Sequence, residues 1–127
     1  MENFEVLVKD SKTYLKVCNS NEVFEGKGKQ IIFEGDDDFQ LAIFRVNSKL
    51  FALENICPHR HADRIFEGII KEHTVMCPLH GWTYSLETGQ NINQKQGIRS
   101  LKNYDVFESD GYVYVEKPQF EIPKWRR

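Results

Sequence analysis

Apolar and polar residues alternate in short runs along most of this chain, and turn-forming residues separate the runs. Runs of this kind are typical of β-strands, and no stretch of about ten residues shows a helical repeat. A single short helix is predicted at residues 20–25, where Asn19 or Ser20 could cap it. The predicted strands cover residues 4–8, 14–18, 29–33, 40–46, 50–53, 106–109 and 112–115.

Two of the predicted turns indicate hairpins. Asp110-Gly111 separates two apolar-rich runs, and these residue types tolerate the positive φ that a two-residue hairpin turn requires. Asn47-Ser48-Lys49 connects the strongly apolar run 40–46 to the run 50–53 in the same way. Many short strands joined by turns predict an all-β fold, an antiparallel sandwich or barrel.

Composition narrows the class of protein. The 127 residues fit one domain, 1–127, and 40% hydrophobic with 28% charged residues is a globular composition. A formal net charge of −2 argues against nucleic acid, and no apolar run is long enough to span a membrane. There is no secretory signal pattern, and three cysteines are an odd number, so we expect a cytoplasmic protein with reduced or metal-bound thiols.

The chain ends in a segment, 118–127, that carries Pro118, Pro123 and Trp125. Because proline interrupts helices and central strands, we expect an extended tail lying on the domain. A docking arm for a partner protein is the alternative.

The middle of the chain holds two similar groups of metal-binding residues. Cys57-Pro58-His59 is followed, after seventeen residues, by Cys77-Pro78-Leu79-His80. Each predicted loop offers one thiolate and one imidazole, and a hairpin of residues 66–70 with 73–76 would bring the loops together. Zinc accepts two Cys and two His, but zinc fingers usually pair like ligands and place the histidines on a helix. A [2Fe–2S] cluster with cysteines on one iron and histidines on the other fits this pattern better.

This pattern resembles the Rieske ferredoxin motif, and the resemblance covers roughly residues 13–116. It implies a Rieske-type antiparallel β sandwich with a small cluster-binding subdomain inserted at about residues 55–86. It also implies one [2Fe–2S] cluster, with Cys57 and Cys77 on one iron and His59 and His80 on the other, solvent-facing iron. Two ferric ions, two sulfides and two thiolates sum to a neutral cluster, which is easier to reduce than one with four thiolates.

Within the family the chain is most similar to the ferredoxins of ring-hydroxylating dioxygenase systems. The resemblance implies an electron-transfer protein, not an enzyme, which carries single electrons from a reductase to a terminal oxygenase or reductase and needs no small-molecule substrate. The run Ser85-Leu86-Glu87-Thr88-Gly89 also resembles the small subunit of assimilatory nitrite reductase, so a non-catalytic small subunit is the alternative. An oxygenase with its own catalytic iron is disfavoured, because only His61 and His73 would remain as its histidine ligands.

The resemblance also has departures. Ala62 and Leu79 stand where high-potential relatives have disulfide cysteines, and Trp82 stands where they have a serine. We therefore expect a potential near the low end of the Rieske range of about −150 to +300 mV. Tyr84 could donate one hydrogen bond to the cluster or serve as a core aromatic.

Four further residues near the motif or on a strand have simpler explanations. His73 is expected on the surface of a strand, and Cys18 is expected as a buried, inert thiol. Arg60 and Arg64 are expected to be ordinary solvated charges, with a docking patch for an acidic partner as the alternative.

Overall fold

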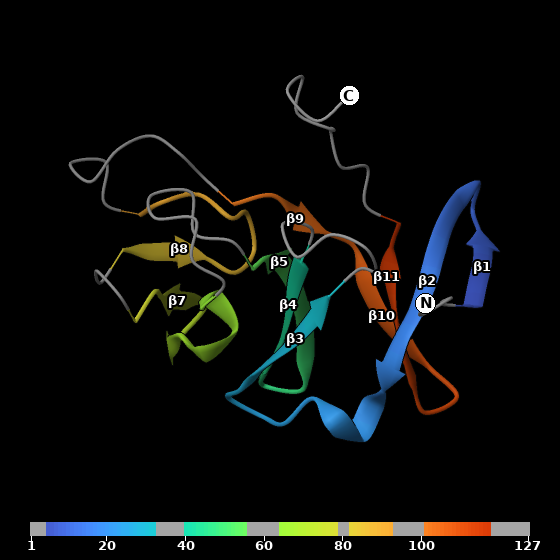
Figure 1. The fold of residues 1–127 in the computed structure, drawn as a ribbon, viewed down its shortest axis with the longest axis horizontal. Helices are drawn as coiled ribbons and strands as arrows, with labels where there is room; N and C mark the ends of the chain where they lie inside the picture. The colour runs from blue at the N-terminus through green and yellow to red at the C-terminus, as the bar shows by residue number, and fades with distance from the viewer. Residues whose placement is uncertain (1–4, 33–39, 56–63, 79–81, 93–100, 118–127) are drawn as a thin grey trace.

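Three antiparallel sheets make up the structure, a computed structural model that describes residues 5–32, 40–55, 64–78, 82–92 and 101–117 (Figure 1). Sheet A has the strand order β1-β2-β11-β10, sheet B the order β3-β4-β5-β9, and sheet C the order β6-β7-β8. The strands of sheet A are β1 (Glu5–Lys9), β2 (Lys12–Asn19), β10 (Val106–Ser109) and β11 (Tyr112–Glu116). Sheet B contains β3 (Gly28–Ile32), β4 (Gln40–Val46), β5 (Lys49–Glu54) and β9 (Asn103–Tyr104). Sheet C contains β6 (Ile69–Lys71), β7 (Thr74–Met76) and β8 (Thr83–Ser85), and it comes between β5 and β9 in the chain.

The all-β prediction is confirmed, and both hairpin predictions hold. Asp110 and Gly111 have φ of 54° and 82°, and Asn47 and Ser48 have φ of 53° and 65°. Positive φ at both central residues matches the right-handed twist of the flanking strands.

Several details differ from the prediction. Only Ser20–Glu22 is helical in the region 20–25, as a 3-10 turn called η1, in which the backbone N–H of Asn19 donates to Glu22. A second 3-10 turn, η2 (Ile65–Glu67), precedes β6, so the strand predicted from residue 66 begins at Ile69. The short strands β8 and β9 were not predicted, because two or three residues are too few for a recognisable alternation.

Strands β4 and β5 lie between two hydrophobic cores. Alternate residues of β4 face opposite ways, so Ala42 and Phe44 join the core shared with sheet C, while Leu41 and Ile43 join the core shared with sheet A. All four are fully buried. This explains why the run 40–46 is almost continuously apolar, since neither of its faces meets solvent.

Arg45 is one of two polar residues in β4, the other being Gln40, and it connects sheet B to sheet A. Its guanidinium donates two hydrogen bonds, of 2.9 and 2.8 Å, to the carboxylate of Glu108 on β10. It also donates to the backbone oxygens of Val23, at 2.8 Å, and Ser20, at 3.1 Å. The hydrogen bond from Arg45 is the main reason that the pKa of Glu108 is lowered.

None of the helices in the described part of the chain has the length and apolar content needed to cross a bilayer.

We predict that Phe44→Ala lowers the free energy of unfolding by about 3–5 kcal/mol, because it opens a cavity between sheets B and C. Phe24→Ala is the matched control, since that ring is 66% exposed and its loss should change stability by about 0.5 kcal/mol or less. Urea denaturation measures both variants. Equal losses in the two variants would contradict the two-sided burial of β4.

We also predict that Glu108 makes stability depend on pH. Because the pKa of Glu108 is lower in the folded protein, its ion pair stabilises the fold above the unfolded pKa and is lost as pH falls through the folded pKa. Glu108→Gln should cost about 1 kcal/mol at pH 7 and flatten the loss of stability in acid. Glu72→Gln, on the exposed β6–β7 turn, is the control and should leave the wild-type pH profile unchanged.

Candidate metal centre

Cys77 stands at the root of the second predicted ligand loop. It follows β7 directly, is 1% exposed, and donates its backbone N–H to the carbonyl oxygen of Trp82 at 2.7 Å. This bond joins the two ends of the β7–β8 connection, the segment of the sequence that contains His80. The two ends of the second predicted ligand loop are therefore held together.

The surroundings of Cys77 are apolar. It belongs to the core between sheets B and C, together with Ile65, Val75, Tyr84 and Leu86, and Trp82 packs against this core. Tyr84 is fully buried, so it serves as a core aromatic; a hydrogen bond from its hydroxyl to a cluster stays a prediction. A sulfur at this position could hold the iron that is shielded from solvent.

The first predicted ligand loop starts beside a buried asparagine that the sequence analysis missed. Asn55 is fully buried, its backbone N–H donates to the Gln40 carbonyl at 3.0 Å, and its Nδ2 donates to Gln40 Oε1 at 2.8 Å. Its Oδ1 accepts the backbone N–H of Phe66 at 2.8 Å. One side chain thus joins the start of the loop to its end and to the start of β4. The one sequence feature that could have indicated this role is the position of Asn55, an amide residue between an apolar strand and Ile56-Cys57.

The segment after β8 is fixed by a glycine. Gly89 has φ of 79°, and its N–H donates to the Ser85 carbonyl at 2.7 Å. Its own carbonyl accepts the N–H of Leu101 at 2.7 Å, and a Cβ at this glycine would lie 1.9 Å from the Leu101 oxygen. The run 85–89 therefore anchors the end of sheet C to the main body of the protein.

Three of the four predicted ligands, Cys57, His59 and His80, lie outside the described residues. The same holds for Arg60, His61, Ala62 and Leu79, and for the segment 118–127. The structure thus places one predicted ligand, Cys77, and both anchors of the segment that carries Cys57 and His59. The set of four ligands stays a prediction.

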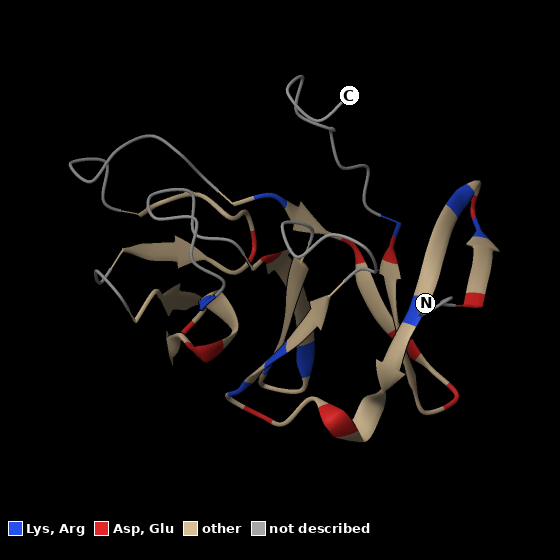
Figure 2. Cartoon of the chain, viewed as in Figure 1, with Lys and Arg blue, Asp and Glu red and all other residues tan. Residues whose placement is uncertain are grey.

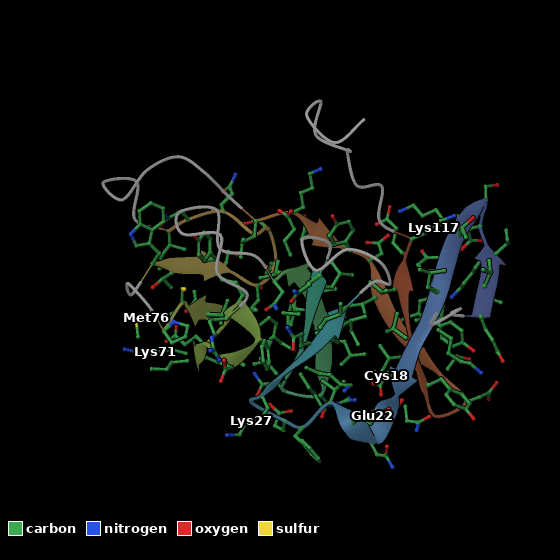
Figure 3. All side chains as sticks on the ribbon, in the orientation of Figure 1. Cys18, Glu22, Lys27, Lys71, Met76 and Lys117 are labelled. Carbon is green, nitrogen blue, oxygen red and sulfur yellow. The ribbon has the colours of Figure 1, made fainter. Side chains whose placement is uncertain are left out.

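Cys18 is separate from this centre. It lies on β2, at the opposite side of the molecule from Met76, the residue before Cys77 (Figure 3). Its side chain is only partly buried, less than predicted, but burial still raises the pKa of the thiol to about 11. The thiol therefore stays protonated near neutral pH, which supports the prediction that it is inert.

His73 and Arg64 are surface residues. His73 lies in the turn between β6 and β7 rather than on a strand, with Nδ1 3.1 Å from a carboxylate oxygen of Glu87. Arg64 is exposed and forms an ion pair with Glu67, at 2.5 Å, which favours the ordinary surface role over a free docking charge.

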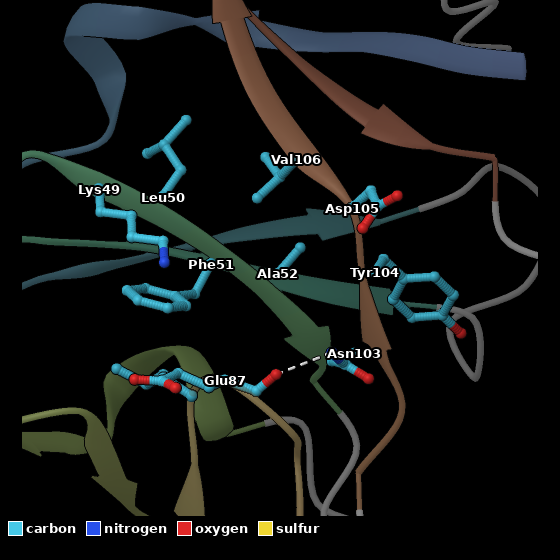
Figure 4. Close-up of a pocket in the computed structure, with 10 residues that line it drawn as sticks. Lys49, Leu50, Phe51, Ala52, Glu87, Asn103, Tyr104, Asp105 and Val106 are labelled. Atoms are coloured by element: carbon cyan, nitrogen blue, oxygen red, sulfur yellow. Dashed lines mark hydrogen bonds between the residues drawn. The ribbon is translucent and has the colours of Figure 1, made fainter. Parts of the chain in front are cut away.

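A separate hollow of about 250 Å³ lies beside β5, β9 and β10 (Figure 4). Two of its polar side chains have structural partners: Asn103 donates to the Glu87 carbonyl at 2.9 Å, and Asp105 pairs with Lys12 at 2.7 Å. Cys77 does not line it, so this hollow is not part of the candidate centre.

The donor chemistry fits an iron–sulfur cluster. Thiolate and imidazole are the ligands of Rieske centres, and Cys77, the one predicted ligand that the structure describes, is buried in an apolar core. Such surroundings would keep water away from an iron bound by Cys77.

Comparison with known proteins gives the same result. The Rieske-like [2Fe–2S] domain matches residues 13–116. The 3-phenylpropionate/cinnamic acid dioxygenase ferredoxin subunit of Photorhabdus laumondii is 31% identical over 102 residues, which cover 80% of this chain and 91% of that protein. Cholesterol 7-desaturase nvd 2 of Ciona intestinalis is 33% identical over 109 residues, which cover 80% of this chain but only 24% of that longer protein.

A solved structure extends the likeness to the whole fold. A chain in the complex of reduced oxygenase and oxidised ferredoxin of carbazole 1,9a-dioxygenase is 28% identical, with a TM-score of 0.72, and the match covers 85% of this chain and 97% of that one. The Rieske-type antiparallel fold predicted from the sequence is confirmed, and the zinc alternative is not supported. The chain therefore belongs to the Rieske-like [2Fe–2S] domain family and carries one [2Fe–2S] cluster.

Proposed function

We propose that this chain is a Rieske-type ferredoxin that takes single electrons from a reductase and passes them to a terminal oxygenase or reductase. The observation that carries the proposal is the buried Cys77 at the base of a closed loop, within a family match that spans both ligand loops. The matches to two ferredoxin relatives cover nearly the whole length of those proteins, which favours a stand-alone carrier. We place the protein in the cytoplasm, where its thiols would stay reduced.

We propose that Cys57 and Cys77 bind the inner iron and that His59 and His80 bind the outer one. When bound, the cluster supplies reversible one-electron chemistry. The part of the protein is to hold the ligands: the Cys77 N–H bond closes one loop, and Asn55 holds the two ends of the other. The apolar core behind Cys77 keeps solvent from the inner side, so exchange with partners would take place at the histidine side.

We propose that the chain has no catalytic site of its own. A terminal oxygenase needs a mononuclear iron held by two histidines and a carboxylate. Of the two histidines outside the motif, His73 is on an exposed turn beside Glu87, and His61 is two residues from His59. A second iron site built on this pair would have to share the cluster loop.

We predict that the cluster-loaded chain mediates electron transfer from NADH, through the flavin reductase of a dioxygenase system, to cytochrome c. The rate of cytochrome c reduction should rise with the concentration of the chain. Cys77→Ser should abolish the rise, because the buried thiolate is lost, whereas Cys18→Ser should retain it. A fully loaded wild-type chain that the reductase leaves oxidised would contradict the carrier function.

The alternative is a non-catalytic small subunit of a nitrite reductase, and a binding experiment distinguishes it from a stand-alone carrier. Size exclusion with a candidate large subunit gives a stable stoichiometric complex for a subunit. Separate elution of the two proteins supports a carrier that binds partners briefly.

We predict that Asn55→Ala lowers the iron and sulfide content per chain. The substitution leaves the Phe66 N–H and the Gln40 amide without their partner, and it should cost about 1–3 kcal/mol of stability. Asn103→Ala, which removes an exposed hydrogen bond to the Glu87 carbonyl, is the matched control and should keep full cluster content. Full iron occupancy and an unchanged melting temperature in Asn55→Ala would show that Asn55 does not anchor the loop.

A further inference from the structure

Strand β1 is an exposed apolar edge of sheet A. Among the described residues it pairs with β2 alone, and every one of its five residues is exposed. Val6 is 62% exposed and Val8 68%. Natural sheets usually protect a free edge, because its unpaired N–H and C=O groups can pair with another strand.

The hairpin geometry shows which backbone groups of β1 point outward. Asp10 and Ser11, with φ of 52° and 66°, form a two-residue turn, so the flanking Lys9–Lys12 pair is hydrogen-bonded. Bonding then alternates along the ladder, and Leu7 and Glu5 also bond to β2. The N–H and C=O groups of Val6 and Val8 therefore point away from β2, toward the free edge.

The sequence of β1, Glu-Val-Leu-Val-Lys, is complementary to itself in the antiparallel direction. Pairing about Leu7 sets Glu5 opposite Lys9 of a second copy, and Val6 opposite its Val8. The oppositely charged ends of the strand are visible in Figure 2. In this register Val6 and Val8 are the hydrogen-bonding pair, which agrees with the direction of their free backbone groups. Apolar and opposite-charge pairs are both favourable across strands.

We propose that β1 is a self-association surface, through which two copies of this chain form a symmetric dimer by antiparallel β1–β1 pairing. Each copy contributes the same strand, as a two-fold interface requires, and sheet A becomes one continuous sheet across both copies. The valines of both copies would meet on one face, and the Leu7 side chains would meet on the other.

The dimer would leave the metal centre accessible. Strand β1 and sheet C, which carries Cys77 between β7 and β8, lie at opposite ends of the molecule (Figure 1). The two clusters would thus face away from each other, free for redox partners. Stable protein–protein interfaces bury about 1,200–2,000 Å² in total, and a pair of single strands buries much less. The fraction of chains in the dimer should therefore rise with protein concentration.

Intrachain contacts set the size of the electrostatic contribution. Glu5 pairs with Lys16 at 2.7 Å but keeps a 74% exposed side chain, and the Lys9 ammonium lies 4.5 Å from the centre of the Phe107 ring. Both side chains are at the surface, and each would exchange its present contact for the pair across the free edge. Surface ion pairs are weak, so reversing one charge, which turns two attractive cross-pairs into repulsive ones, should weaken the dimer about tenfold.

Sedimentation equilibrium of the cluster-loaded chain, up to about 1 mM, tests the proposal. The wild type should show a reversible monomer–dimer equilibrium. Lys9→Glu and Glu5→Lys should each weaken it about tenfold, and an equimolar mixture of the two variants should recover dimers, because each charge again meets its opposite. The visible spectrum and melting temperature of each variant provide the check that it is folded.

A second variant tests the backbone pairing. Val8→Pro removes an outward N–H and leaves the β1–β2 ladder intact, so it should abolish the dimer. A wild-type chain that stays monomeric throughout would overturn the proposal, as would a dimer that survives both Lys9→Glu and Val8→Pro. Neither result bears on electron transfer, which the cytochrome c assay tests separately.

Discussion

The burial of the β4–β5 hairpin on both faces is the constraint on which the rest of this structure depends. Phe44 and Leu53 face sheet C, while Ile43 and Ala52 face sheet A, so one hairpin supplies the centre of two hydrophobic cores. Neither sheet A nor sheet C could bury its own apolar face without it. Because β5 leads into the first ligand loop, the most firmly packed part of the protein is also where the metal centre begins.

The centre combines apolar packing with a few directed hydrogen bonds. The core excludes water around Cys77, while the bonds of Asn55 and the bond from Cys77 to Trp82 fix the roots of the two loops. The Asn55 side chain can be buried because its Nδ2 and its Oδ1 both have hydrogen-bond partners. Polar interactions thus hold the ends of the two loops, while apolar packing surrounds Cys77.

Sequence patterns predicted the parts of this architecture that local rules determine. The alternation of apolar residues gave the long strands, and Asp110-Gly111 gave a hairpin, because such turns depend on residues close together in the chain. The β1–β2 turn at Asp10 and Ser11 was not predicted. Strand β9 depends on β5, a partner far away in the chain. The role of Asn55 follows from Gln40 and Phe66, which no local pattern relates to it. The ligand motif was recognised because its spacing is distinctive, not because its geometry could be derived.

The central claim is that this fold holds a [2Fe–2S] cluster through two cysteines and two histidines, Cys57, His59, Cys77 and His80. Pulsed electron–nuclear double resonance on the dithionite-reduced protein, grown with ¹⁵N-histidine, tests it most directly. We expect couplings to two coordinated histidine nitrogens, and the loss of one of them in His80→Cys. A reduced cluster without any histidine nitrogen coupling would contradict it.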